Sequence, residues 1–281
     1  MKKLISILSV IILALPVMVF ASGMESAVDL SNASLTMDYN LNANGSIASV
    51  HNLLDDTWTT YDNGRAMSTT LDGEVIACYH YENSVLVSVT DQYASQVWYT
   101  NGQKTHKTNH NGETTASYDY NAAGQLTTII DETKDASDPT RVTTYNYDGK
   151  ILTSMNSFDG DGQAQTTYFE SGRQTHTVSD VTGVTTAVFS YDSDYRLSRV
   201  DSYDKNGGGY KGYTTYDSHQ RADKSYDQAG NLAAETVYDG AKIFQQVSFP
   251  GGENGSTINV TQYNEYGEIE AMYTTENPGG W

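Results

Sequence analysis

A repeating unit of about 22 residues constrains this chain more than any other feature of its sequence. The clearest copy is SYDYNAAGQLTTIID, from Ser117 to Asp131, with two tyrosines, a turn containing Gly124 and a stretch that begins at Leu126. Alternate residues of a strand point to the same face, and glycine supplies the positive φ that tight turns require. The unit therefore predicts a β-hairpin. One hairpin alone is only marginally stable in water, so the unit needs neighbours.

The unit recurs along nearly the whole chain. Each copy has a tyrosine followed closely by a polar residue, and most copies continue with a glycine-bearing turn and an aliphatic residue. A period in the twenties predicts a repeat architecture, here with about 11 hairpins. The residues that carry this signature, which we interpret as structural, are Tyr39, Tyr61, Tyr81, Tyr99, Tyr120, Gly124, Leu126, Tyr147, Tyr168, Tyr191, Leu197, Tyr216, Tyr238 and Tyr263.

The number of hairpins predicts the shape of the fold. Eleven hairpins make about 22 strands, whereas twisted open sheets rarely exceed about 10 strands before they curl or split. We therefore expect an all-β fold in which tandem hairpins form a curled or spiral antiparallel β-sheet, and each hairpin contacts only its neighbours. The tyrosines should line one face of this sheet, with buried rings and with hydroxyls that are hydrogen-bonded or hydrated.

Apolar residues after the turns lie three apart, as in Leu126 and Ile129 or Leu197 and Val200. Strict alternation in a strand would place them two apart. Either a β-bulge follows each turn or the sheet is partly covered on both faces, and the sequence leaves both alternatives open.

The first residues form a different segment. Two lysines precede an apolar run from Leu4 to Phe20, and small or short residues lead to a cleavage site between Ala21 and Ser22. This pattern is typical of a secretory signal peptide and predicts export to the periplasm or the medium, with no membrane span after cleavage. The predicted organisation is a signal peptide over 1–21, an N-terminal lead-in or cap over 22–33, the repeat domain over 34–276 and a C-terminal tail over 277–281.

Charge and cysteine content exclude some partners. Without the two lysines of the leader the chain keeps 14 basic and 35 acidic residues, a net charge of −21. Such a surface repels nucleic acids and anionic membranes, so we expect neither as a partner. The single cysteine, Cys78, excludes an intramolecular disulfide, and it is expected to be a small buried residue rather than a nucleophile.

No catalytic residue and no cofactor are predicted, because the sequence contains no nucleophile elbow and no phosphate loop. His106 and His110 are four residues apart, but an adjacent Asn-Gly turn favours hairpin residues over half of a zinc site. A weak calcium candidate combines Asp159, Asp161 and Glu170 at the spacing of a calcium loop, without the glycine that its sharp turn requires. Turn aspartates more often cap their own backbone, so no metal is predicted.

Several copies resemble known repeat families. YDYNAAGQL, FSYDSDYRLSRV and SYDQAGNL resemble the YD repeat of rearrangement-hotspot (RHS) and wall-associated proteins. The units at 98–112 and 168–180, WYTNGQKTHKTNHNG and YFESGRQTHTVSD, resemble MORN-like repeats of an antitoxin-type group. Both resemblances imply β-hairpin arrays, and the second implies an interaction scaffold. Neither implies a catalytic residue.

The sequence therefore favours an exported, non-catalytic YD-repeat scaffold that binds an unidentified protein or glycan at the cell envelope or outside the cell. One alternative is a carbohydrate-active enzyme that uses the curved sheet as a substrate trough. Another is a periplasmic immunity-type protein that neutralises a basic toxin. Exposed terminal strands could also pair edge to edge, which would produce self-association.

Overall fold

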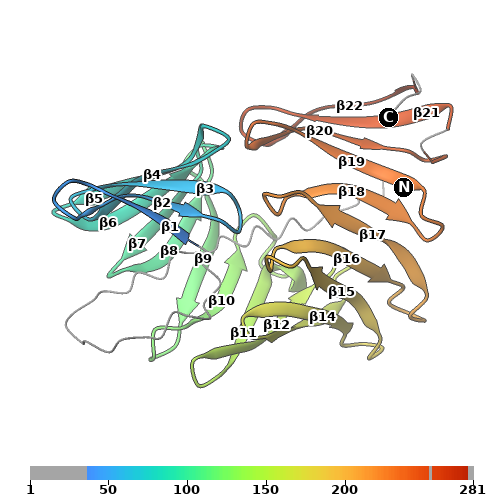
Figure 1. Ribbon diagram of the computed structural model, residues 1–281. Coiled ribbons are helices and arrows are strands. Elements are labelled where there is room, and N and C mark those ends of the chain that lie inside the picture. Colours follow the sequence, from blue (N-terminus) through green and yellow to red (C-terminus); the bar gives the residue numbers. More distant parts are fainter. Residues whose placement is uncertain (1–36, 253–254, 278–281) are drawn as a thin grey trace.

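The computed structural model describes residues 37–252 and 255–277, and these residues form an all-β coil (Figure 1). Their 22 strands belong to one antiparallel sheet in which each strand pairs with the next along the chain. The sheet does not close, because β1 pairs only with β2 and β22 only with β21 among these residues. The predicted fold class, about 11 tandem hairpins in a curled antiparallel sheet, is confirmed. The predicted signal peptide, the lead-in over 22–33 and the tail after Asn277 lie outside the described residues.

The strands are short and regular, as expected of a hairpin array. They are β1 (Met37–Leu41), β2 (Ile47–Asn52), β3 (Thr57–Asp62), β4 (Arg65–Leu71), β5 (Glu74–Glu82), β6 (Val85–Asp91), β7 (Gln96–Thr100), β8 (Gln103–Thr108), β9 (Thr114–Tyr120), β10 (Leu126–Asp131), β11 (Val142–Asp148), β12 (Ile151–Phe158), β13 (Ala164–Glu170), β14 (Arg173–Ser179), β15 (Thr185–Tyr191), β16 (Leu197–Tyr203), β17 (Tyr210–Tyr216), β18 (Ala222–Asp227), β19 (Leu232–Asp239), β20 (Lys242–Ser248), β21 (Thr257–Tyr263) and β22 (Ile269–Glu276). A single 3₁₀ turn, η1 (Pro139–Arg141), precedes β11. Within the described ranges no helix is long and apolar enough to cross a membrane.

Many acidic residues and asparagines serve the turns. In eight turns the side-chain Oδ1 of one residue accepts the backbone N–H groups of the residues two and four positions further on. This is how Asp and Asn stabilise tight turns. The eight residues are Asp91, Asn109, Asn121, Asp159, Asp192, Asp217, Asp227 and Asn264.

A β-bulge explains the three-residue spacing of the apolar side chains. Leu126 pairs with Tyr120 and Thr128 pairs with Asp119, so Thr127 is the extra residue of the ladder. The bulge brings Leu126 and Ile129 to the same face of the sheet although they are three apart. The same shift of register separates Leu197 from Arg199 after the turn between β15 and β16. Of the two alternatives left open by the sequence, the bulge is present.

The strip coils until its later turns rest on its earlier ones (Figure 1). The guanidinium of Arg196 donates to the carbonyl of Leu53 at 2.7 Å, and the side-chain amide of Gln220 donates to the carbonyl of Leu54 at 3.1 Å. The backbone N–H of Ala241 donates to Glu74 at 3.0 Å. Each contact joins a turn, or in the case of Glu74 the first strand residue after a turn, to another turn thirteen or fifteen strands further along the chain. We call this line of contacts the seam.

Charged groups reinforce the seam. The ring of His219 lies between two acidic residues from the turns after β2 and β4. Its Nε2 is 3.7 Å from Asp56 and 3.4 Å from Asp72. Arg221 donates to the carbonyl of Gly240 at 2.8 Å and approaches Asp72 at 3.8 Å. The side chains of His219 and Arg221 are half-buried, whereas those of Asp56 and Asp72 are exposed, so solvent partly screens these pairs. The seam therefore holds the coil at a defined pitch.

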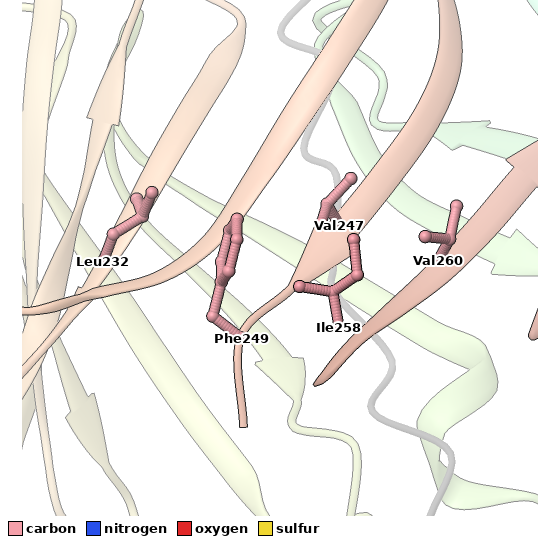
Figure 2. Close-up of a cluster of buried hydrophobic side chains, with 5 residues drawn as sticks. All are labelled: Leu232, Val247, Phe249, Ile258 and Val260. Atoms are coloured by element: carbon pink, nitrogen blue, oxygen red, sulfur yellow. The ribbon is translucent and has the colours of Figure 1, made fainter. Parts of the chain in front are cut away.

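One compact apolar core lies in the last third of the chain (Figure 2). It consists of Leu232, Val247, Phe249, Ile258 and Val260, with Tyr226 packed against it. Val247 is the most completely buried side chain of the group, and it pairs with Glu235 on one side and Val260 on the other. Elsewhere in the described ranges buried apolar side chains are scattered, so neighbouring hairpins rather than one central core stabilise the rest of the strip.

Candidate functional site

The recurring tyrosines occupy one structural position in most hairpins. This position, which we call the signature position, is the last residue before the turn whose side chain points to the face that these tyrosines share. Its cross-strand partner is the residue directly before the β-bulge. Nine predicted tyrosines occupy it, and all of them project to one side of the sheet, the tyrosine face: Tyr61, Tyr81, Tyr99, Tyr120, Tyr147, Tyr191, Tyr216, Tyr238 and Tyr263.

Two predicted members sit elsewhere. Phe169 takes the signature position in β13, opposite Gln174, so the neighbouring Tyr168 projects from the second face and stacks on His176 with ring centroids 4.8 Å apart. In β1 the signature position is occupied by Leu41. Tyr39 lies two residues earlier and projects from the tyrosine face. A shift of one residue moves a side chain to the other face, which is why pattern matching misplaced Tyr168.

Three signature tyrosines use their hydroxyls to tie their hairpin to the previous one. The hydroxyl of Tyr147 donates to the carbonyl of Leu126 at 2.9 Å, and that of Tyr238 donates to the carbonyl of Ala222 at 2.9 Å. Both acceptors stand next to the bulge of the preceding hairpin, opposite its own signature tyrosine. Tyr191 reaches Gln174 in the same way at 3.0 Å. Because bulges interrupt the ladder, this hydrogen bond gives the tyrosine a structural reason to recur.

The first half of the tyrosine face is dense in aromatic rings. Between β1 and β11 it carries nine tyrosines, which are Tyr39, Tyr61, Tyr79, Tyr81, Tyr99, Tyr118, Tyr120, Tyr145 and Tyr147. All but the exposed Tyr39 are half-buried, so part of each ring and hydroxyl reaches the surface. Neighbouring rings are close enough to influence one another's ionisation.

Burial raises the pKa of seven of these nine tyrosines. It raises the pKa of Tyr99 to about 12, with the nearby Tyr79, Tyr118 and Tyr120 acting in the same direction. Burial also raises the pKa of Tyr145, helped by Tyr147. Lys104, on the same face, behaves conversely, since burial and then Lys107 lower the pKa of Lys104, whose ammonium lies 5.8 Å from the centroid of Tyr118. The face therefore presents aromatic rings, neutral hydroxyls and the ammonium groups of Lys104 and Lys107.

These shifts predict a loss of stability in alkaline solution. The folded pKa of each buried tyrosine is raised above its ordinary value of 10.0, so the stabilisation is complete below that pH. It is lost as the pH rises toward the value of about 12 for Tyr99, because only the unfolded chain ionises freely in this window. Urea unfolding followed by circular dichroism should show a falling midpoint above about pH 10. An unchanged midpoint up to about pH 12 would contradict this account.

The structure separates the metal candidates of the sequence. Asp159 and Asp161 lie together, but both bind the ammonium of Lys205, at 3.0 and 2.6 Å. Glu170 is at the far end of β13, so it does not join them. His106 stacks on Trp98, whereas His110 stacks on Tyr266 across the seam. Within the part of the chain that the structure describes, no three histidine, cysteine or carboxylate side chains are grouped to hold a metal ion.

The second face carries aromatic pairs that sequence reasoning missed. His51 stacks on Trp58 at 4.2 Å and Tyr213 on Tyr226 at 4.6 Å, each across a pair of neighbouring strands. The guanidinium of Arg199 covers the other side of Tyr213 at 3.7 Å. Only the register shows which of these side chains meet, since they are distant in sequence or belong to different repeats. Cys78 also faces this side and is half-buried rather than buried.

A shallow recess lies beside the tyrosine face. It has a volume of about 310 Å³ and is lined by Ala123, Gln125, Tyr147, Gly149 and Lys150, from the turns after β9 and β11. Gln125 crosses it to donate to the carbonyl of Gly149 at 2.7 Å. The polar side chains in its lining are Gln125, Tyr147 and Lys150.

Comparisons with known proteins give limited information. No family model and no curated protein matches the chain. Similar solved structures include the Tc holotoxin pore of Photorhabdus luminescens with a mutated TccC3 component, at 11% identity and a TM-score of 0.28. They also include a TcdB2–TccC3 crystal structure, at 13% identity and a TM-score of 0.22. Each match covers 86% of this chain but only 16% of the other chain. Neither similarity assigns a family or an activity.

Proposed function

We propose that this chain is an exported, non-catalytic repeat scaffold of the YD type, which binds a protein or a glycan through its tyrosine face. The observation that carries the proposal is the group of nine tyrosines between β1 and β11, of which all but one are half-buried. Their rings offer apolar area and their neutral hydroxyls offer hydrogen bonds, and tyrosine combines the two at many interfaces. Export to the periplasm or the medium rests on the leader pattern over 1–21.

The roles of the acidic side chains favour binding over catalysis. Asp91, Asp192 and Asp227 each accept two backbone N–H groups of their own turns. Asp159 does the same and also binds Lys205, which Asp161 shares. A glycosidase needs one protonated and one ionised carboxyl facing each other across a substrate. Carboxylates held by turns and by a lysine do not provide that pair.

The test combines affinity capture with substitutions on the tyrosine face. The purified protein is immobilised at low salt and exposed to a cell-envelope extract, and separately to a panel of polysaccharides. A partner retained by the native protein should be retained at least about tenfold less well by a Tyr99→Leu/Tyr118→Leu variant, which loses two rings and two hydroxyls. Leucine keeps much of the apolar volume, so circular dichroism should show an intact sheet.

Tyr195→Leu is the matched control, because Tyr195 is an exposed tyrosine in the turn after β15 and lies outside this group. It should bind like the native protein. Equal retention by all three proteins would place binding away from the tyrosine face. Retention of no protein and no polysaccharide by the native chain would refute the scaffold proposal itself, and release of sugar from a retained polysaccharide would refute the non-catalytic part.

A further inference from the structure

The two ends of the sheet present similar apolar edges. β1 and β22 each have a strand partner on one side only among the described residues. Tyr39 and Leu41 of β1 are 56% and 61% exposed, and Met272 of β22 is 71% exposed. These side chains, together with Ile269, project from the tyrosine face, and among residues 37–252 and 255–277 they lack the neighbouring strand that covers their equivalents inside the strip.

The junctions between successive hairpins within the molecule show in which register two such edges pair. Where β2 meets β3, Val50 lies opposite Thr59, which is two residues before the signature position at Tyr61. Where β4 meets β5, the equivalent residue Thr69 lies opposite Ala77, four residues before Tyr81. Each arrangement recurs at four more junctions.

Applied to the ends of the chain, both arrangements join apolar residues. Met272 is the residue of β22 equivalent to Val50, because it stands three past the first residue after the turn. The first arrangement would place it opposite Tyr39 of β1, and the second opposite Met37. The direction also fits, because strands alternate along the strip and an added β1 would run antiparallel to β22.

We propose that the β22 edge of one molecule pairs with the β1 edge of a second copy of this chain, so that the coil continues from molecule to molecule. This contact joins two different surfaces head to tail. Such a contact leaves one edge free at each end and therefore generates open helical assemblies rather than closed dimers. The inference is independent of the ligand of the tyrosine face.

The seam supports the same arrangement. Turns after β2, β4, β6 and β8 contact turns thirteen strands further along, after β15, β17, β19 and β21. By the same offset, the turn after β10 would contact the turn after the first strand of the added copy. The added molecule would thus be held by a strand ladder and by a continuation of an interface that already exists within each chain.

The edges carry few of the usual devices against such pairing. Natural sheets protect exposed edges with lysine, proline or very short strands. β22 has eight residues with neither lysine nor proline, and the chain between Glu270 and Glu276 is uncharged. The remaining obstacle is like charge, since the edges carry Asp38, Glu270 and Glu276 on a chain of net charge −19. Salt screens this repulsion, so assembly should strengthen as ionic strength rises.

Engineered cysteines test the contact directly. In a Cys78→Ala background, Met272→Cys protein is mixed with Tyr39→Cys protein, and separately with Met37→Cys protein, under mild oxidation at high salt. Opposed residues of neighbouring strands are within disulfide range, so the mixture that matches the register should give a cross-linked heterodimer, and a chain carrying both of its substitutions should give a ladder of oligomers. Val181→Cys is the control for Met272→Cys, because Val181 is similarly exposed but lies in the turn after β14. Yields no higher than those of the control pairs in both mixtures would overturn the proposal.

Sedimentation velocity supplies an independent readout. The purified protein should form larger species as concentration and salt rise, and Met272→Lys should weaken association by about tenfold or more through loss of apolar contact and added hydration. Because residue 272 is exposed, this variant should keep the native circular dichroism spectrum. A protein that stays monomeric at all concentrations and salt levels contradicts the proposal.

Discussion

Replacement of Gly212 by alanine is expected to break the pairing of β17 with β18. Gly212 lies opposite Asp227, and a Cβ atom at this position would stand 2.0 Å from the carbonyl oxygen of Tyr226 and 2.9 Å from the carbonyl carbon of Asp227. Its φ of +133° is also one that other residues rarely adopt. Strain and overpacking each cost about 1–3 kcal/mol, so the combined loss of unfolding free energy should be about 3–5 kcal/mol.

The measurement should be resolved by residue, because long repeat arrays do not always unfold in one step. Amide hydrogen exchange should show lost protection centred on β17 and β18, with smaller changes in distant hairpins. Gly230→Ala is the control, since Gly230 has a φ of +85° but no atom within 4 Å of an added Cβ. It should lose only about 1–2 kcal/mol through backbone strain. Equal losses for the two variants would show that the close approach at Gly212 is unimportant.

Truncation of Phe249 should have the second large effect. Phe249 is 4% exposed and lies in the apolar core with Leu232, Val247, Ile258 and Val260 (Figure 2). Loss of a buried phenylalanine ring removes its transfer free energy and leaves a cavity, which together cost about 3–5 kcal/mol. Phe249→Ala should therefore destabilise the hairpins from β19 to β22, as measured by urea unfolding with hydrogen exchange.

Phe244→Ala is the matched control for this prediction. It makes the same chemical change on β20, but Phe244 is 46% exposed, and it is the extra residue of the bulge after the turn. Phe244→Ala should lower the free energy of unfolding by about 1 kcal/mol or less, because the substitution removes little apolar area from a buried site. If Phe249→Ala proved as mild as Phe244→Ala, the cluster would contribute little to the stability of this end of the coil.

Residues of the candidate site that interact within one hairpin turn were predictable from the sequence, whereas residues whose contacts depend on strand register were not. Asn121 and Gly124 act within one turn, and Tyr120 and Leu126 pair across it, so a pattern of fifteen residues was enough to locate them. Tyr168 was misplaced because the neighbouring Phe169 fits the signature position equally well, and a one-residue slip reverses the face. The stacking of Tyr213 on Tyr226 depends on cross-strand register, which the sequence does not express as a local pattern.

The sequence by itself determined the hairpins, their number and the face that most of the tyrosines share, because each depends on turn chemistry and on the two-residue period of a strand. The tertiary structure alone decided how tightly the strip coils. Arg196 meets Leu53 and Gln220 meets Leu54 across 143 and 166 residues, and no repeat unit records these partners. Coiling sums small rotations between successive strands, each affected by bulge and turn geometry, so the meeting points emerge only when all the rotations are combined.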